Sequence, residues 1–156
     1  MSKPFKLPKK DFLSNLDLTY EDITRILQLA KQFKNKELDI NLKNKVLGLI
    51  FDKSSTRTRV SFQVAMSRIG GTTIEINSIN SQIGRGEPIK DTARVLSRYC
   101  DVLAIRTFKQ SSLEEYAKWS AKPVINALTD IEHPCQALAD FFTMQEEFGD
   151  IRKVVL

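Results

Sequence analysis

Two arginines and four hydroxyl side chains lie within six consecutive residues, Ser54-Ser-Thr-Arg-Thr-Arg59. The apolar run at 46–50 before them indicates a buried parallel strand. The apolar residues after them have the spacing of a helix packed on a core: Phe62, Ala65, Met66 and Ile69. The first turn of a helix offers unpaired N–H groups and the positive end of the helix dipole. With hydroxyl donors and a guanidinium fork from Arg57 or Arg59, this turn is suited to bind a phosphate-like anion.

The structural alternative for this turn is that Ser54 or Ser55 caps the helix while the arginines are solvated. We favour that alternative for any single residue of the turn. For the cluster as a whole we favour the anion site, because two arginines and four hydroxyls are more than a helix cap requires.

The composition is that of an ordinary globular domain, with 156 residues, 42% hydrophobic and 28% charged. No apolar run approaches the roughly 20 residues that span a bilayer, and the amino terminus carries no export-like apolar segment. Cys100 and Cys135 form no disulfide framework and no metal-ligand spacing with His133, so we expect no metal and a reducing cytoplasm. The net charge of +5 favours anionic ligands. No basic tract alternates with aromatics, so neither nucleic acid nor a membrane is the expected partner.

Alternating apolar runs predict a four-stranded α/β domain over residues 1–150. After an irregular arm at 1–18, Thr19 with Asp22 at N3 caps a helix that ends near residue 35. The predicted strands lie at 46–51, 72–76, 101–108 and 123–128. Further helices are expected to begin near Thr56, at Pro88, at a Ser111/Glu114 capping box and at Pro134. This alternation predicts a parallel sheet with helices on both faces, a three-layer αβα fold.

Ligands of such sheets bind beyond the carboxyl ends of the strands. The turn at 54–59, Arg106 and the loop before His133 all follow predicted strand ends, so we expect one crevice to collect them. The loop at 77–87 matches neither a dinucleotide fingerprint nor a Walker A loop. Three structural alternatives stand beside this hypothesis: Arg106 pairs with an acidic neighbour, His133 merely precedes the helix-opening Pro134, and Gln82 is an ordinary loop residue.

Several segments, in this order and spacing, resemble the carbamoyltransferase superfamily, and within it the amino-terminal, carbamoyl-phosphate-binding half of the ornithine carbamoyltransferases. They cover essentially the whole chain: Ser55–Arg59, Ser81–Glu87, Asp91–Arg98, Arg106, Val124–Leu128, His133–Gln136 and Leu138–Asp140. The aspartate-specific relatives share the Ser-Thr-Arg-Thr-Arg motif and the His-Pro-x-Gln motif. The loop that corresponds to residues 77–89 usually carries a serine and a lysine in those relatives. This chain has Gln82 there and no lysine between 77 and 89. A relative specific for putrescine or another amine stays open.

The resemblance implies an enzyme that transfers the carbamoyl group of carbamoyl phosphate to ornithine, giving citrulline in arginine biosynthesis, without metal or organic cofactor. Ser55, Thr56, Arg57 and Thr58 would hold the phosphate. Arg106 would bridge the phosphate and the carbamoyl oxygen, His133 would donate to that oxygen, and Gln136 would bind the carbamoyl amide. The family forms trimers, so Gln82 would reach the active site of an adjacent subunit. Cys135 has no expected catalytic role.

Family members run about twice this length, and the motifs that bind ornithine, D-x-x-x-S-M-G and H-C-L-P, are absent here. Residues 151–156 read as the start of another strand, and we expect them to begin a second, ornithine-binding domain. The chain alone is therefore expected to fold as the carbamoyl-phosphate domain but to have little or no transferase activity. The alternatives are a catalytically silent regulatory module of the same fold, which the intact motifs argue against, and a nucleic-acid-binding protein, suggested only by the pI near 9.2.

Overall fold

The structure is a computed structural model that describes residues 7, 9–77 and 81–149. Its helices and strands alternate along the chain as the apolar pattern predicts. In order they are η1 (Asn15–Asp17), α1 (Tyr20–Lys34), β1 (Val46–Phe51), α2 (Arg57–Arg68), β2 (Thr72–Asn77), η3 (Ile83–Arg85), α3 (Ile89–Tyr99), β3 (Val102–Arg106), α4 (Gln110–Trp119), β4 (Val124–Leu128) and α5 (Pro134–Phe148).

The four strands form one parallel sheet in the order β2-β1-β3-β4. Strand β1 lies inside the sheet, where Gly48 is in register with Ile74 of β2 and with Leu103 of β3. Between β3 and β4 the register shifts after Ile105, so that Arg106 pairs with Leu128. The predicted parallel four-stranded sheet is confirmed, and the shift falls beside one of the predicted site residues.

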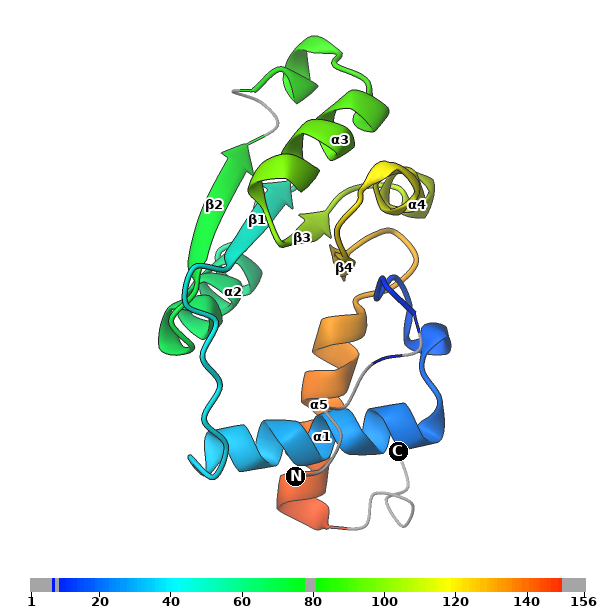
Figure 1. The fold of residues 1–156 in the computed structure, drawn as a ribbon. Helices are drawn as coiled ribbons and strands as arrows, with labels where there is room; N and C mark the ends of the chain where they lie inside the picture. The colour runs from blue at the N-terminus through cyan, green and yellow to red at the C-terminus, as the bar shows by residue number, and fades with distance from the viewer. Residues whose placement is uncertain (1–6, 8, 78–80, 150–156) are drawn as a thin grey trace.

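Helices cover both faces of the sheet, as Figure 1 shows. On one face, α3 and α4 pack on alternate strand residues in a core that contains Ile50, Ala93, Leu103, Ile105, Leu113 and Tyr116. On the other face, α2 packs on the intervening residues, in a core of Leu47, Leu49, Met66 and Ala104 joined by Phe62. Side chains of a strand alternate between faces, so strands with helices on both sides are apolar throughout. The three-layer αβα fold is confirmed.

Helix α5 begins after β4 and leads away from the sheet, and α1 crosses it there (Figure 1). The two helices are joined by an ion pair in which Lys34 Nζ lies 2.8 Å from Glu146 Oε2, and the same ammonium lies over the Phe142 ring. Because the first turn of α5 lies at the sheet and its last turns lie on α1, the helix places its amino terminus beside the carboxyl ends of the strands.

The start of α1 agrees with its sequence signal, whereas two other helix starts do not. Thr19 and Asp22 form the predicted capping box of α1. The predicted Ser111/Glu114 box is wrong, because α4 begins earlier, at Gln110, whose N–H donates to Asp130 Oδ1 at 2.9 Å. A distant carboxylate satisfies that helix end, and local spacing cannot reveal it. Pro88 precedes α3 as its N-cap rather than occupying the first helical position.

Residues 9–17 are more ordered than the irregular arm that the sequence predicts for residues 1–18. Phe12 forms a parallel bridge with Ile125 at the edge of β4, donating from its N–H to Val124 O and accepting from Asn126 N–H, both at 2.8 Å. The side-chain amide of Asn126, which is fully buried, donates to Leu13 O at 2.8 Å. Extended backbone therefore continues the sheet beyond β4 and covers part of its exposed edge.

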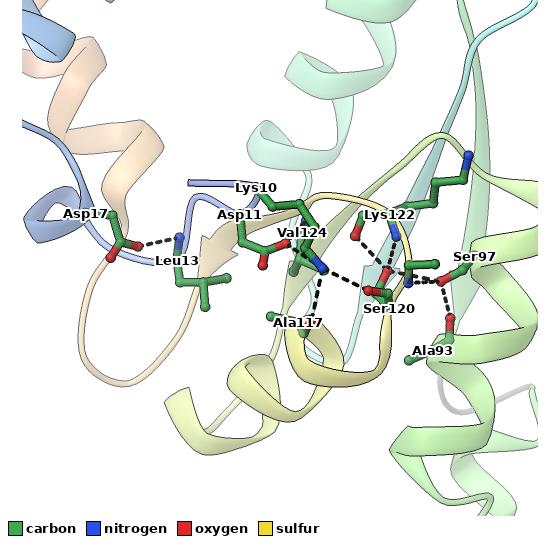
Figure 2. A network of polar contacts seen from close by, with 11 residues as sticks. Lys10, Asp11, Leu13, Asp17, Ala93, Ser97, Ala117, Ser120, Lys122 and Val124 are labelled. Carbon is green, nitrogen blue, oxygen red and sulfur yellow. Dashed lines mark hydrogen bonds and ion pairs between the residues drawn. The ribbon is translucent and has the colours of Figure 1, made fainter. Parts of the chain in front are cut away.

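Figure 2 shows how polar contacts tie this segment to the helical layer. Lys10 Nζ donates to the carbonyl oxygens of Ala117 at 3.2 Å and Ser120 at 2.8 Å, close to the end of α4. Asp11 Oδ1 accepts from Val124 N–H at 2.8 Å. Ser97 Oγ and Ser120 Oγ lie 3.0 Å apart and link α3 to the end of α4. The predicted strand start at 151–156 lies outside the described residues.

Candidate anion-binding site

A cleft of about 780 Å³ opens at the carboxyl ends of β1, β3 and β4. Its lining includes every predicted anion-site residue except Gln82: Ser55, Thr56, Arg57, Thr58, Arg106, His133 and Gln136. These residues come from three separate strand ends. The rule that ligands of parallel sheets bind beyond the carboxyl ends of the strands therefore predicted their meeting place.

The turn from β1 into α2 leaves the helix start without a side-chain cap. Thr56 is the N-cap residue, and its side chain forms no capping hydrogen bond. Ser54 and Ser55 do not cap the helix either, so the cap proposed in the structural alternative is wrong, whereas Arg57 is exposed, as that alternative expects. The first N–H groups of α2 and the hydroxyl groups of the turn remain available to an anion in the cleft.

The two arginines of the turn have different surroundings. Arg57 is exposed and lines the cleft. Arg59 lies outside the cleft lining, and its Nη1 lies 2.8 Å from Glu75 Oε1 on β2. The sequence left both as candidates for a guanidinium fork, and the structure places only Arg57 where an anion in the cleft can contact it.

Arg106 is the last residue of β3 and is partly buried. Its backbone carbonyl accepts from Asp52 N–H at 2.9 Å, which joins the strand to the turn that begins the cleft. Its Nε is buried and has no hydrogen-bond partner among the described residues, nor does Arg106 form an ion pair there. The structural alternative, pairing with an acidic neighbour, therefore has no partner in this part of the chain. A buried donor without a partner is costly, so a ligand acceptor at this position would stabilise it.

His133 is the N-cap residue of α5 and lines the same cleft. Its Nδ1 is buried without a partner among the described residues. Burial and the nearby positive charge of Arg106 lower the pKa of His133 below its usual value of 6.5, against a smaller opposing effect of Asp140. The ring is therefore neutral at pH 7 and retains one N–H, which it can donate to an oxygen of a ligand.

The loop that carries His133 is organised by the buried hydroxyl of Thr129. Thr129 Oγ1 donates to Gln110 Oε1 at 2.8 Å and accepts from the N–H groups of Ile131 at 3.3 Å and Glu132 at 3.5 Å. The Thr129 N–H donates to Glu132 O at 3.1 Å and closes the turn. Sequence analysis missed this residue, and the signal that could have found it is a threonine followed by polar residues after a strand, the pattern of a hydroxyl-stabilised turn.

Cys135 and Gln136 occupy the first turn of α5. Burial raises the pKa of the Cys135 thiol to about 11, and its Sγ donates to Asn126 O at 3.5 Å. A protonated thiol is a poor nucleophile, in agreement with the absence of an expected catalytic role. Gln136 lines the cleft, and its Nε2 donates to Asp140 Oδ1 at 2.9 Å.

Gln82 lies elsewhere, exposed at the N-cap of η3 and outside the residues that line the cleft. Its carbonyl accepts from the N–H groups of Arg85 and Glu87, both at 3.0 Å. The cleft also has a set of lining residues that sequence analysis did not select: Ser54, Ser61, Phe62, Ala65, Leu128, Cys135 and Ala139. Ser61 lies one helical turn after Arg57 and Ala139 one turn after Gln136, so helical spacing from the predicted residues could have found them.

Neither a metal cluster nor a membrane span is present in the part of the chain that the structure describes. No three His, Cys, Asp or Glu side chains lie close enough together there to hold a metal ion. None of the helices within residues 9–77 and 81–149 has the length and apolar character needed to cross a bilayer.

Comparison with known proteins identifies the family of this domain. Residues 10–146 match the family model described as aspartate/ornithine carbamoyltransferase, carbamoyl-P binding domain. The chain belongs to this family. The carbamoyl-P binding domain accounts for nearly all described residues, and the resemblance drawn from the sequence motifs is confirmed.

The relatives include ornithine carbamoyltransferases and an aspartate transcarbamoylase. The ornithine carbamoyltransferase of Prochlorococcus marinus subsp. pastoris is 73% identical over 156 residues, which are 100% of this chain and 51% of that protein. The crystal structure of ornithine carbamoyltransferase from Gloeobacter violaceus is 54% identical with a TM-score of 0.83, over 90% of this chain and 46% of that one. Aspartate transcarbamoylase from Trypanosoma cruzi, solved with aspartate and phosphate, is 33% identical with a TM-score of 0.86, over 93% and 46%. This carbamoyl-P binding domain thus spans about half the length of the curated relatives it matches.

Proposed function

We propose that this chain is the carbamoyl-phosphate-binding half of an ornithine carbamoyltransferase. Such an enzyme transfers the carbamoyl group to the side-chain amine of ornithine and yields citrulline and phosphate, a cytoplasmic step of arginine biosynthesis. The family of the domain supports carbamoyl phosphate as the ligand. The 73% identity to a relative named ornithine carbamoyltransferase, against 33% to an aspartate transcarbamoylase, supports ornithine as the acceptor.

One observation supports the ligand above the others: two buried nitrogen atoms without hydrogen-bond partners among the described residues belong to side chains that line one cleft. These are Arg106 Nε and His133 Nδ1. In the proposed complex the phosphate lies at the start of α2, against the hydroxyls of the turn and Arg57. Arg106 then contacts both the phosphate and the carbamoyl oxygen, and His133 donates to that oxygen. Gln136 faces the carbamoyl amide.

The chemistry follows from this arrangement. The side-chain nitrogen of ornithine attacks the carbamoyl carbon with its lone pair, a C–N bond forms, and the carbonyl oxygen takes up negative charge. Arg106 and His133 stabilise this oxygen, the role of an oxyanion hole. The oxyanion then collapses, the bond between the carbamoyl carbon and the bridging oxygen breaks, and phosphate leaves with the bonding pair. The attacking nitrogen loses a proton, and citrulline and phosphate result.

The two oxyanion donors contribute differently because only one of them carries charge. The guanidinium of Arg106 is cationic at all relevant pH values. The lowered pKa of His133 keeps its ring neutral at pH 7, so it acts through an N–H donor rather than through charge. Removing one such donor typically lowers turnover about 10²–10³-fold.

The proposed transfer needs a site for ornithine, and the described cleft does not contain the family motifs that bind it. We therefore expect the 156-residue chain to form no citrulline from carbamoyl phosphate and ornithine in a colorimetric assay. Measurable citrulline formation by the purified chain would show that these residues alone complete the acceptor site.

The ligand is tested by calorimetric titration with phosphonoacetamide, a stable analogue that keeps the carbamoyl amide and replaces the bridging oxygen by CH2. Arg57→Ala is compared with Arg59→Ala, because both remove one guanidinium from the first turn of α2 and only Arg57 lines the cleft. Loss of a charge-assisted hydrogen bond should weaken binding about 10- to 100-fold in Arg57→Ala. Arg59→Ala should change the affinity less than about threefold, since exposed ion pairs contribute little.

The outcomes separate the proposal from general electrostatic attraction. Equal weakening by both substitutions would show that only net charge matters and would contradict the proposed contact. Circular dichroism verifies that the unaltered chain is folded. If the folded chain does not bind phosphonoacetamide, the function proposed for these residues by themselves is contradicted.

We further propose that the chain forms a homotrimer in which Gln82 reaches the cleft of a neighbouring copy. Two facts support this: Gln82 is exposed at the N-cap of η3, and it is absent from the residues that line the cleft of its own chain. Sedimentation velocity of the purified chain tests the oligomeric state, and a monomer at all concentrations would contradict it.

A further inference from the structure

The side chain of Gln136 is held by a residue one turn further along α5. Its Nε2 donates to Asp140 Oδ1 at 2.9 Å. Gln136 lines the cleft, and so does Ala139, the residue before Asp140. No lysine or arginine within the described ranges forms an ion pair with Asp140. Among the described residues, the Asp140 side chain accepts a hydrogen bond from Gln136 alone, and its charge also acts on His133.

The chemistry of the two groups decides which way the amide of Gln136 faces. An ionised carboxylate only accepts hydrogen bonds, whereas the end of a glutamine offers NH2 on one side and a carbonyl oxygen on the other. The amide must therefore turn its NH2 to Asp140, and Oε1 is the polar atom left for the cleft. Among the described residues, no donor is hydrogen-bonded to that oxygen.

We propose that Asp140 determines which acyl group the cleft accepts, by holding Gln136 with its Oε1 toward the ligand. An acceptor at this position binds a group that carries N–H, such as the carbamoyl NH2, and leaves a methyl group of the same size without a partner. The preferred ligand class is then a carbamoyl phosphate over an acyl phosphate such as acetyl phosphate. This inference rests on the proposed function, because it needs a phosphorylated carbonyl compound in the cleft.

A hydrogen-bond acceptor discriminates between a carbamoyl and an acetyl group more strongly than the shape of the cleft does. A methyl group and an NH2 group differ little in volume, so a cleft without polar contacts barely separates them. A site built to hydrogen-bond its ligand rejects the analogue that lacks the donor, because the acceptor of the site is left unpaired. The rejection requires that Gln136 cannot rotate its amide to suit either ligand. A rotated amide would place Oε1 against the negative oxygens of Asp140.

The test uses two stable ligands that differ only in the group at issue. Phosphonoacetamide carries NH2 where acetonylphosphonate carries CH3, and both have the same phosphonate and carbonyl groups. Calorimetry gives the ratio of their affinities for the unaltered chain and for three variants. Asp140→Asn replaces an obligate acceptor by an amide that can donate or accept, and Asp140→Glu keeps the carboxylate. Glu147→Gln is the matched control, since it makes the same change of charge at an exposed position near the end of α5.

The unaltered chain, Asp140→Glu and Glu147→Gln should prefer phosphonoacetamide. In Asp140→Asn this preference should fall about three- to tenfold, the size of one charge-assisted hydrogen bond at an exposed site. The affinity for acetonylphosphonate should stay the same or rise. An unchanged ratio in Asp140→Asn, or equal weakening of both ligands, would overturn the inference while leaving the proposed function intact. Failure of the unaltered chain to bind either ligand would overturn both.

Discussion

Arg59 Nη1 lies 2.8 Å from Glu75 Oε1, and this contact joins the first turn of α2 to the edge strand β2. Arg57, two residues earlier, lines the cleft instead. Successive helical residues point about 100° apart, so residues two positions apart face nearly opposite sides of the helix. The motif Ser-Thr-Arg-Thr-Arg thus contains one arginine for a ligand and one that fixes the helix to the sheet.

The single histidine of the chain permits a direct measurement of its protonation. Burial and Arg106 lower the pKa of His133, so its imidazole signals in NMR should titrate with a midpoint below 6.5. Phosphonoacetamide should move this midpoint upward, because its negative charge beside Arg106 favours the imidazolium. A midpoint at or above 6.5 in the free chain would contradict the buried position of the ring.

The same group should make stability depend on pH. The folded state holds His133 neutral, so its contribution is complete above pH 6.5 and decreases as the pH falls below that value. It levels off once the pH is below the folded pKa. Urea unfolding at pH 7.5 and 5.5 should show a larger loss of unfolding free energy for the unaltered chain than for His133→Gln. Equal losses in the two proteins would assign the pH dependence to other groups.

Removal of the Thr129 hydroxyl should loosen the loop that carries His133. Thr129→Val keeps the shape of the side chain but leaves Gln110 Oε1 and the Ile131 N–H without their partner. Buried polar groups left unpaired cost about 1–3 kcal/mol. Urea unfolding should show this loss, and the His133 titration midpoint should move toward 6.5 as the ring gains solvent. Thr129→Ser keeps the hydroxyl and should keep the His133 midpoint of the unaltered chain. If Thr129→Val leaves that midpoint unchanged, Thr129 contributes to stability but does not position His133.

Mixing two weakly binding variants tests whether Gln82 contributes to the cleft of a neighbouring copy. Arg57→Ala and Gln82→Ala should each bind phosphonoacetamide weakly alone. After unfolding and refolding together, some sites combine an intact Arg57 from one chain with an intact Gln82 from its neighbour, so calorimetry should recover strong binding. Arg57→Ala mixed with Arg106→Ala is the control, because both changes lie in the cleft of one chain. Equal recovery in both mixtures, or none in the first, would contradict a shared site.

A methyl group at Gly48 should destabilise the centre of the sheet. An added Cβ would lie 2.8 Å from Leu103 Cδ2 and 2.9 Å from Cys100 Sγ, both in the core beneath α3. Overpacking of this kind typically costs about 1–3 kcal/mol in unfolding free energy. Leu103→Val removes the Cδ2 atom, so Gly48→Ala with Leu103→Val should lose less than the sum of the single variants in urea unfolding. Strict additivity would show that the two positions do not collide.

The sequence by itself determined the strands, the helices between them and seven of the residues that line the cleft, while Gln82 lies outside the cleft. Apolar runs separated by helical patterns are local signals, and a parallel sheet is the arrangement that connects them. Because its strands run in one direction, their carboxyl ends meet at one edge, and the turn at 54–59, Arg106 and His133 had to converge. The capping box at Thr19 was likewise readable because its partners lie within one helical turn.

Only the tertiary structure decided the contacts made by residues distant in the chain. It assigned Arg59 to Glu75 and left Arg57 in the cleft, it placed Asp130 at the start of α4, and it paired Phe12 with Ile125. In each case the partner lies 16 or more residues away, and local spacing carries no information about which distant group arrives. That Arg106 Nε has no hydrogen-bond partner within residues 9–77 and 81–149 has the same origin, since it depends on which distant groups pack around it.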